Sequence, residues 1–447
     1  MMRDGEAMAG AARRERACPA WAGRWGSSVA VLLVALIFLA AWFISRPAYL
    51  VLAGLPDAVI RPAPFPDLYS ILLAGQCWAQ GTNVYLPSPC LGGTFNYSPL
   101  MLRVFAWSHL TSADTLAGGA VLLAGYALAL GWMKPARSWR ELALRAAVCA
   151  SPTAWFALEQ ANFDVLLFIA SAGAFWLLGR AWRWRRFAYA IFLGGFVMKF
   201  YPAALLVLAC RERRGRFILL TLVSLAVAVW FYLSFYMTLT HSKILLDFTQ
   251  PFENTFGAAN LPAGLMILHW LSIDPNLFHH GYGPAHFLPN PWLMRALLAG
   301  AVGVSLATRR GAMEALAVLE PGERFYLLGG AVLICFCFFA AQNVSYRAIY
   351  MGFLMPGLWR LAGRGRAHRL AVFAVLLLQW EALVRDGLQL LGHWLIHNDS
   401  LEAMFWLVRE LVWWGLAVYL LRLVLAYVLP NLLRLWRGEI DASSGAA

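Results

Sequence analysis

Long apolar stretches of this chain contain no charged residue, and this restricts its fold more than any other feature. Examples are residues 29–44, 217–235 and 325–341, which are rich in Ala, Leu, Val and Phe. A helix needs about 20 apolar residues to cross the hydrocarbon core of a bilayer, so these stretches approach or reach that length. Charged residues make up 13% of the chain and hydrophobic residues 61%, which matches no soluble globular class. The sequence therefore predicts an all-α, polytopic integral membrane protein.

We expect about ten to twelve transmembrane helices, with further helices in the outer loops. The predicted spans are 28–44, 114–133, 141–157, 163–178, 186–199, 202–210, 216–237, 291–308, 325–341, 346–361, 370–384 and 405–428. Span 370–384 carries Glu381 near its outer end. The first span resembles a signal-peptide core, but Arg46 and Pro47 behind it do not form a small-residue cleavage site. We therefore interpret it as a retained membrane anchor.

Clusters of basic residues between the apolar runs predict the orientation. If both termini lie inside, the clusters at 13–16, 134–140, 180–186, 211–216, 309–310, 360–369 and 434–437 share one side, which the positive-inside rule makes the cytoplasm. The net charge of +13 is then mainly a topology signal, and nucleic acid is not an expected partner. We expect a multi-pass protein of the inner (plasma) membrane, with cytoplasmic tails at 1–27 and 429–447 around a transmembrane domain at 28–428.

Two long segments, 45–113 and 238–290, are left on the extracytoplasmic side. They carry polar residues that membrane packing does not require, namely Asp57, Asp67, Asn83, Asn96, Tyr97, Asp247, Glu253, Asn254, Asn260, Asp274, His279, His280 and His286. Long irregular segments held by a rigid scaffold are usually functional. No cytoplasmic loop reaches the size of a domain. We therefore expect the function to face outward.

The chain lacks the signatures of enzymes that use nucleotides or metals. It has no Gly-rich phosphate loop, no Gly-x-Ser-x-Gly elbow, no His-Glu-x-x-His and no Asp-x-Asp pair. The spacing of His279, His280 and His286 fits no standard zinc site, so we interpret them as part of a solvated loop. We expect no cofactor and no metal. The substrates of an enzyme of this kind would be lipids or extracytoplasmic molecules.

Asp67 stands at the start of a short amphipathic segment in the first outer loop. Behind it, apolar residues recur at helical spacing, namely Leu68, Ile71, Leu72, Gly75 and Trp78. One interpretation is a helix cap, in which the carboxylate accepts from free backbone N–H groups. The other is a general base at the mouth of a membrane cavity, a role that contributes about 10²- to 10⁴-fold in rate.

Two cations stand at the outer ends of predicted spans. Lys199 lies in Lys-Phe-Tyr-Pro, with Tyr201 and a proline that starts the next span, and Arg347 follows Asn343 at the start of a later span. Lys199 could extend its ammonium to the membrane surface. Alternatively, both cations could converge on one anion such as a lipid phosphate, because charge inside a membrane is usually functional. Tyr97, Gln160 and Asn162 lie in outer turns, where interfacial packing and helix capping are the competing interpretations.

Taken in order, these motifs resemble glycosyltransferase family 87 of the GT-C superfamily. The resemblance covers about residues 60–360. It rests on an Asp that opens the first outer helix, Asn-Tyr-Ser-Pro at 96–99, Gln-x-Asn at 160–162, Lys-Phe-Tyr-Pro at 199–202 and a late Tyr-Arg at 346–347. The chain departs from the family in having Glu159 where Gly is usual, and Asn343 and Arg347 where some members carry a late His.

The resemblance implies a GT-C-like membrane enzyme. A hexose, mannose in many members, would move from a polyprenyl-phosphate donor to a lipid or glycan acceptor hydroxyl on the extracytoplasmic face. Asp67 would be the catalytic base, and Lys199 and Arg347 would bind the donor phosphate. Tyr97, Gln160, Asn162, Tyr201 and Asn343 would contact substrate. The alternatives are a lipid-linked glycan polymerase or ligase, for which 238–290 would be the large late outer loop, and a transporter or flippase of glycolipid, for which we see no internal repeat.

Cys77 and Cys90 are the two cysteines of the outer segments, and both fall in the first one. An extracytoplasmic loop lies in an oxidising compartment, so we expect them to form a disulfide, with two free thiols as the alternative.

The predicted orientation can be tested by labelling single cysteines with a membrane-impermeant thiol reagent in intact cells. Cysteines placed at 67, 280 and 399 should react, and those at 185, 214 and 366 should be protected, because the basic clusters lie inside. Protection at position 280 would overturn the arrangement.

Overall fold

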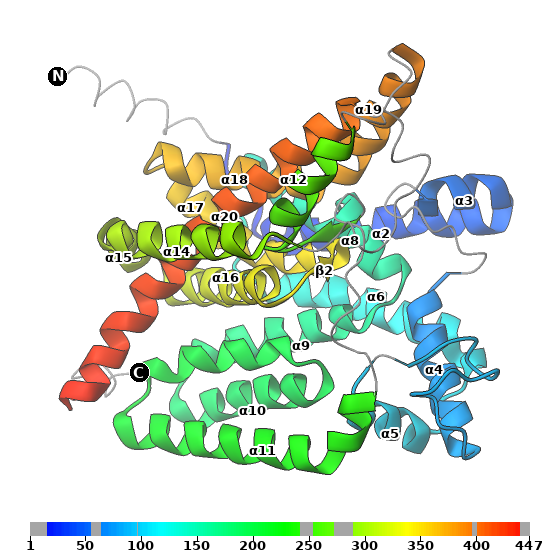
Figure 1. Cartoon of the computed structure of the whole chain (residues 1–447). Coiled ribbons are helices and arrows are strands. Elements are labelled where there is room, and N and C mark those ends of the chain that lie inside the picture. Colours follow the sequence, from blue (N-terminus) through cyan, green and yellow to red (C-terminus); the bar gives the residue numbers. More distant parts are fainter. Residues whose placement is uncertain are drawn as a thin grey trace.

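Helices make up nearly all of the protein in a computed structural model (Figure 1), which describes residues 16–54, 64–95, 97–241, 254–271, 289–395 and 400–438. The first half contains α2 (Ala20–Ile44), α3 (Arg46–Gly54), α4 (Pro66–Ala79), α5 (Pro99–Ser108), the 3-10 helix η1 (Ser112–Asp114), α6 (Thr115–Trp132), α7 (Trp139–Cys149), α8 (Pro152–Glu159), α9 (Phe163–Leu178), α10 (Trp182–Met198), the 3-10 helix η2 (Tyr201–Arg211) and α11 (Arg214–His241).

The second half adds two short strands to the helices. Its elements are β1 (Thr255–Phe256), α12 (Asn260–Leu271), α14 (Pro291–Ala307), α15 (Arg309–Ala317), α16 (Pro321–Ala340), β2 (Asn343–Val344), the 3-10 helix η4 (Ser345–Leu354), α17 (Met355–Ala362), α18 (Arg366–Gln379), α19 (Glu381–Leu395) and α20 (Ser400–Arg437). The strands pair antiparallel, with Thr255 opposite Val344. Asp57 and the histidines at 279, 280 and 286, with most of segment 238–290, lie outside the described residues.

The described residues contain five helices that are long and apolar enough to cross a membrane, or up to eight if each bent pair of helices is one span. The all-α class is confirmed, and it is compatible with a polytopic membrane protein. The count of long apolar helices falls below the predicted ten to twelve spans, because several predicted spans form short or bent helices. Pro152 begins α8 inside span 141–157, and span 202–210 forms the 11-residue 3-10 helix η2. Proline has no N–H group and obstructs the preceding helical turn, which accounts for the break before α8.

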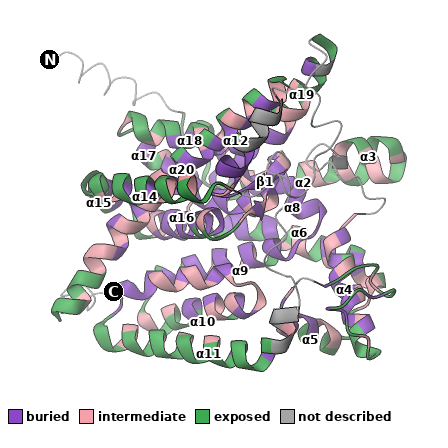
Figure 2. Cartoon of the chain, viewed as in Figure 1, coloured by how far each residue is buried: buried purple, intermediate pink, exposed green. Residues whose placement is uncertain are grey.

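Burial separates the central helix from those at the edge. In the most apolar 18-residue stretch of α16, 78% of the residues are buried, whereas in that of α11 6% are buried. Figure 2 shows α11 exposed along most of its length and α16 surrounded by other helices. An apolar helix with so much exposed surface needs an apolar solvent, which a bilayer provides.

A charged pair lies between α19 and α20. Glu381 opens α19 and is 3% exposed, with a carboxylate oxygen 3.6 Å from Nε of Arg409 in α20. Arg409 also donates to Glu410 at 2.6 Å and to the carbonyl of Thr255 in β1 at 2.8 Å. The acid predicted near the outer end of a span is therefore paired with an arginine, as buried charge requires.

The turn between α8 and α9 holds the start of α4. Helices α8 and α9 meet at 110°. The Phe65 amide donates to the Glu159 carbonyl at 2.8 Å, and the Asp67 amide donates to the Gln160 carbonyl at 3.2 Å. These bonds satisfy backbone donors that any helix N-terminus leaves open. Phe65 and Ala161 both have left-handed backbones, with φ of 65° and 44°, an arrangement that non-glycine residues adopt mainly where tertiary contacts enforce it.

Cys77 of α4 and Cys90 form a disulfide, which confirms the expected bridge. The bridge lies in the loop that leads from α4 to Tyr97. In the same loop, the Tyr85 hydroxyl donates to the Tyr97 carbonyl at 3.2 Å. Part of the first outer segment is thus covalently attached to the helix that carries Asp67.

Replacing Cys77 and Cys90 together by Ala should destabilise the protein by about 3 kcal/mol, because an open loop has more freedom in the unfolded chain. The midpoint of thermal unfolding in detergent measures the effect. Cys18→Ala, at a free cysteine, should leave it unchanged. If the double variant melts like the parent, the bridge adds no stability.

Candidate functional site

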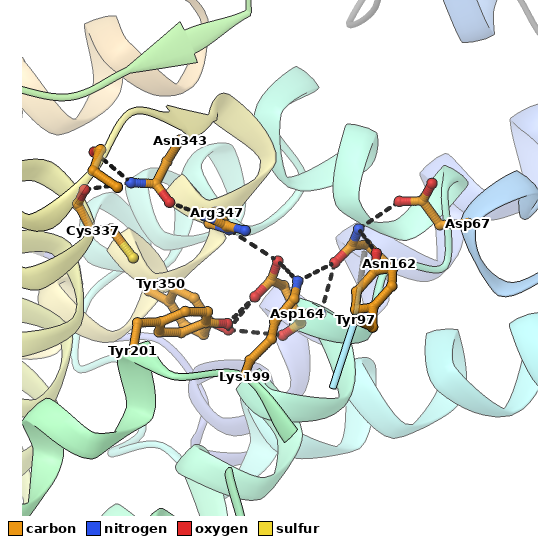
Figure 3. A network of polar contacts seen from close by, with 11 residues as sticks. Asp67, Tyr97, Asn162, Asp164, Lys199, Tyr201, Cys337, Asn343, Arg347 and Tyr350 are labelled. Carbon is orange, nitrogen blue, oxygen red and sulfur yellow. Dashed lines mark hydrogen bonds and ion pairs between the residues drawn. The ribbon is translucent and has the colours of Figure 1, made fainter. Parts of the chain in front are cut away.

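A chain of polar contacts joins four parts of the fold at one end of the helix bundle (Figure 3). The contributions come from the start of α4, the turn before α9, the junction of α10 with η2, and β2 with η4. Seven of the eight predicted site residues belong to this network through their side chains, namely Asp67, Tyr97, Asn162, Lys199, Tyr201, Asn343 and Arg347.

Asp67 lies in the first turn of α4 but does not cap it. Pro66 is the first helical residue and Phe65 occupies the N-cap position, so the capping interpretation of Asp67 is wrong. Its carboxylate accepts a hydrogen bond of 2.5 Å from Nδ2 of Asn162. The side chain is partly exposed, and the dipole of α4 favours its ionised form.

Asn162 is the centre of the network. Its Oδ1 caps α9 by accepting from the amide of Asp164 at 2.9 Å, and it also accepts from Nζ of Lys199 at 3.1 Å. Its Nδ2 donates to Asp67 and, at 3.2 Å, to the hydroxyl of Tyr97. The neighbours fix the amide orientation, because the oxygen faces only donors and the nitrogen faces a carboxylate. Helix capping and site organisation are therefore combined in one side chain.

Tyr97 reaches the network from the first outer loop. Burial and the nearby Asp67 carboxylate hold the pKa of the Tyr97 hydroxyl well above its ordinary value. The hydroxyl therefore stays protonated and can donate a hydrogen bond while it accepts one from Asn162.

Lys199 points into the protein and not toward the membrane surface. Its side chain is 10% exposed, and Nζ lies 2.7 Å from Oδ2 of Asp164. The ammonium also lies 5.1 Å from the ring centre of Tyr97 and 5.8 Å from that of Tyr346, at cation–π distance. The interpretation of Lys199 as a side chain that extends to the interface is therefore wrong.

Asp164, which the sequence analysis missed, lies between the two cations. It is fully buried and accepts from Lys199 and from the hydroxyls of Tyr201 and Tyr350, the latter at 3.0 Å. Nε of Arg347 lies 3.6 Å from the same carboxylate. The available signal was an acid at the second position of span 163–178, because ionisable residues inside apolar spans are functional candidates.

Arg347 is the most accessible cation of the network. Its side chain is 24% exposed, and Nη1 donates to Oδ1 of Asn343. Asn343 is held in turn by the Ala341 carbonyl, to which its Nδ2 donates at 2.8 Å. Nε of Arg347 is buried and makes no hydrogen bond within the described part of the chain, and it lies 3.6 Å from the Asp164 carboxylate.

Gln160 is the predicted site residue whose side chain points elsewhere. Its Nε2 donates to Glu159 at 2.9 Å, and Glu159 also accepts from the hydroxyl of Tyr49 in α3 at 2.9 Å. Gln160 acts through its backbone carbonyl, which holds the amide of Asp67. Glu159, the departure from the family pattern, thus ties the turn to α3.

The described residues of the network include two acids, Asp67 and Asp164, and two cations, Lys199 and Arg347. Asp164 is saturated by its donors and inaccessible, whereas Asp67 is partly exposed. Of these two carboxylates, only Asp67 can therefore reach an external proton donor.

An apolar cavity of about 390 Å³ lies between α4, α5, α6 and the start of α9. Its lining includes Leu68, which follows Asp67 in the chain, Ala161, which precedes Asn162, and one acid, Asp114. Such a cavity suits a hydrocarbon chain. In the ranges that the structure describes, no group of three or more His, Cys, Asp and Glu side chains could hold a metal ion.

Comparisons with protein-family models, curated proteins and solved structures give no match for this chain. The family resemblance therefore remains a prediction from the motifs.

Replacing Asp164 by Asn should destabilise the protein by about 3–5 kcal/mol, because Lys199 and Arg347 would lose their shared counter-charge in a buried site. Adding Lys199→Met removes one of the excess cations and should recover part of this loss. Thermal unfolding in detergent measures both variants, with Glu314→Gln at an exposed position of α15 as control. If Asp164→Asn is as mild as this control, the ion pairs do not stabilise the fold.

Proposed function

We propose that this protein is a membrane glycosyltransferase that moves a hexose from a polyprenyl-phosphate donor to an acceptor hydroxyl on the extracytoplasmic face. One observation carries the proposal. Asp67, an accessible carboxylate, lies one carboxamide away from Lys199, which shares Asp164 with Arg347, and the residue after Asp67 lines an apolar cavity. A transfer from a lipid phosphate needs these three elements together, namely a base, a site for an anionic leaving group and a place for a lipid chain.

Asp67 is the proposed general base. It takes the proton from the acceptor hydroxyl while the hydroxyl oxygen attacks the anomeric carbon of the sugar. The bond between that carbon and the phosphate oxygen breaks, and its electrons leave with the polyprenyl phosphate. The proton ends on Asp67 and the sugar on the acceptor. Asn162 holds Asp67 in place by a direct hydrogen bond.

Lys199 and Arg347 are proposed to stabilise the leaving phosphate. Nε of Arg347 has no hydrogen-bond partner among the described residues, and its side chain is the more exposed of the two. Lys199 is shared with Asp164 and Asn162, which keeps it oriented before substrate arrives. Donors that are already oriented do not pay a reorganisation cost when charge develops on the leaving group. Tyr97, Tyr201 and Asn343 position these groups in the proposed site.

The outward orientation is supported by two independent features. Disulfides persist in oxidising compartments, and the Cys77–Cys90 bridge belongs to the loop that joins Asp67 to Tyr97. The basic clusters at 134–140, 180–186 and 211–216 lie at the other ends of the helices that lead to the network. The sugar itself is proposed as mannose from the family resemblance.

Replacing Asp67 by Asn should slow sugar transfer by about 10²- to 10⁴-fold, because the carboxamide keeps the size of the side chain but is not a base. The assay uses purified protein, a polyprenyl-phosphate hexose as donor and sugar release as readout. Thermal unfolding should change little, since Phe65 and not Asp67 occupies the N-cap of α4.

Asp57→Asn is the comparison variant, because Asp57 is the nearest other acid of the first outer segment. It should retain normal turnover. If Asp57→Asn is inactive and Asp67→Asn is not, the base has been misassigned. If the parent protein releases no sugar but moves a lipid-linked glycan whole, the polymerase, ligase or flippase alternatives replace the present proposal.

A further inference from the structure

A second cavity, of about 830 Å³, opens at the end of the helix bundle opposite the Asp164 network. It lies where α6 and α9 end and α16 begins, with α2 and α10 along its sides. The two sites lie at opposite ends of α9, because Asp164 is in its first turn and Trp176 and Leu177 are in its last. We propose that this cavity binds an anionic phospholipid of the leaflet opposite the Asp164 network, with the lipid phosphate held by Arg24, Lys134 and Arg180.

The charges that line the cavity are all positive. Arg24 comes from α2, Lys134 from the loop after α6 and Arg180 from the turn after α9, and no carboxylate belongs to the lining. Lys134 shares its charge with Glu320, 3.0 Å away just outside the cavity. In the described part of the chain, no carboxylate lies within ion-pair distance of Arg24 or Arg180. The net charge of the lining therefore favours an anion.

The ends of α6 and α9 could oppose an anion, because the last carbonyls of a helix carry partial negative charge. Here several of these carbonyls are already occupied. Arg211 donates to the Leu178 carbonyl at 3.1 Å, Arg145 donates to the Lys134 carbonyl, and the Tyr326 hydroxyl donates to the Trp132 carbonyl at 3.2 Å. Two further arginines thus lie behind the cavity wall, and one of them, Arg145, is also paired with Glu141.

The rest of the lining suits a lipid better than a free ion. Phe175, Tyr326 and Met133 form buried walls, and the partly exposed rings of Trp132 and Trp176 stand at the rim. Tryptophan prefers this level at the boundary between headgroups and hydrocarbon. The guanidinium of Arg180 lies 4.3 Å from the ring centre of Trp176, so the cation is held at the rim. Basic pockets between helices are a known way to bind anionic lipid headgroups.

Native mass spectrometry of the full-length protein in neutral detergent tests the proposal. The probes are phosphatidylglycerol, phosphatidylcholine of matched acyl chains and inorganic phosphate. We expect retention of phosphatidylglycerol in preference to the other two. Replacing Arg24 and Arg180 together by Gln should weaken this retention by about fivefold for each cation removed.

A cavity-filling variant and a surface variant complete the test. Gly179→Leu keeps every charge but occupies the cavity, and Gly179 has an ordinary helical φ of −72° with room for a side chain. It should also reduce retention, and it serves if the double variant does not fold. Arg364→Gln, at an exposed position in the turn before α18, should not.

Three outcomes would overturn the proposal. Equal retention in the parent, the double variant and Gly179→Leu would indicate binding outside the cavity, and so would an equal loss in Arg364→Gln. Binding of inorganic phosphate as strong as that of phosphatidylglycerol would make the cavity a free-phosphate site.

Discussion

A buried carboxylate in the first turn of an apolar helix is stable only with partners, and Asp164 obtains them from three other elements. Lys199 comes from the end of α10, Tyr201 from η2, and Tyr350 with Arg347 from η4. Removing any of these segments would leave charge unpaired in a medium that solvates it poorly. The relative positions of α9, η2 and η4 are therefore set by one carboxylate. Asn162, two residues earlier, extends the same constraint to α4 through Asp67.

This constraint also decides how the two acids differ. Asp164 uses its lone pairs on Lys199 and two tyrosine hydroxyls and has no access to solvent, so it serves as a fixed counter-charge. Asp67 is partly exposed and is held by the Asn162 amide. One structural acid and one accessible acid, joined through Asn162 and Lys199, are the basis of the proposed chemistry.

The sequence predicted where helices lie better than how they are interrupted. Hydropathy located α9 and α16 closely, and the shared side of Lys199 and Arg347 predicted that the two would meet, as they do at Asp164. Asp164 itself was missed because averaging over a window conceals a single acid among fourteen or more apolar neighbours. The cap at Phe65 could not be predicted, because Phe65 is held left-handed by a tertiary contact. A Cβ at Gly119 of α6 would lie 2.2 Å from the Phe65 ring, so that glycine makes the space for it.

At the basic end of the molecule, arginines form ion pairs within the fold, in addition to the orientation that the positive-inside rule predicts for them. Arg137 lies 2.5 Å from Glu320 and 3.0 Å from Glu323, and Arg185 lies 2.7 Å from Glu212. These pairs join different elements of the fold, so some of the positive charge holds the bundle together at this end. Arg24 and Arg180, which line the second cavity, have no carboxylate within ion-pair distance in the described ranges. The two ends of the bundle therefore differ. The Asp164 network pairs cations with a buried acid, whereas the second cavity has a positive surplus that a lipid phosphate can balance.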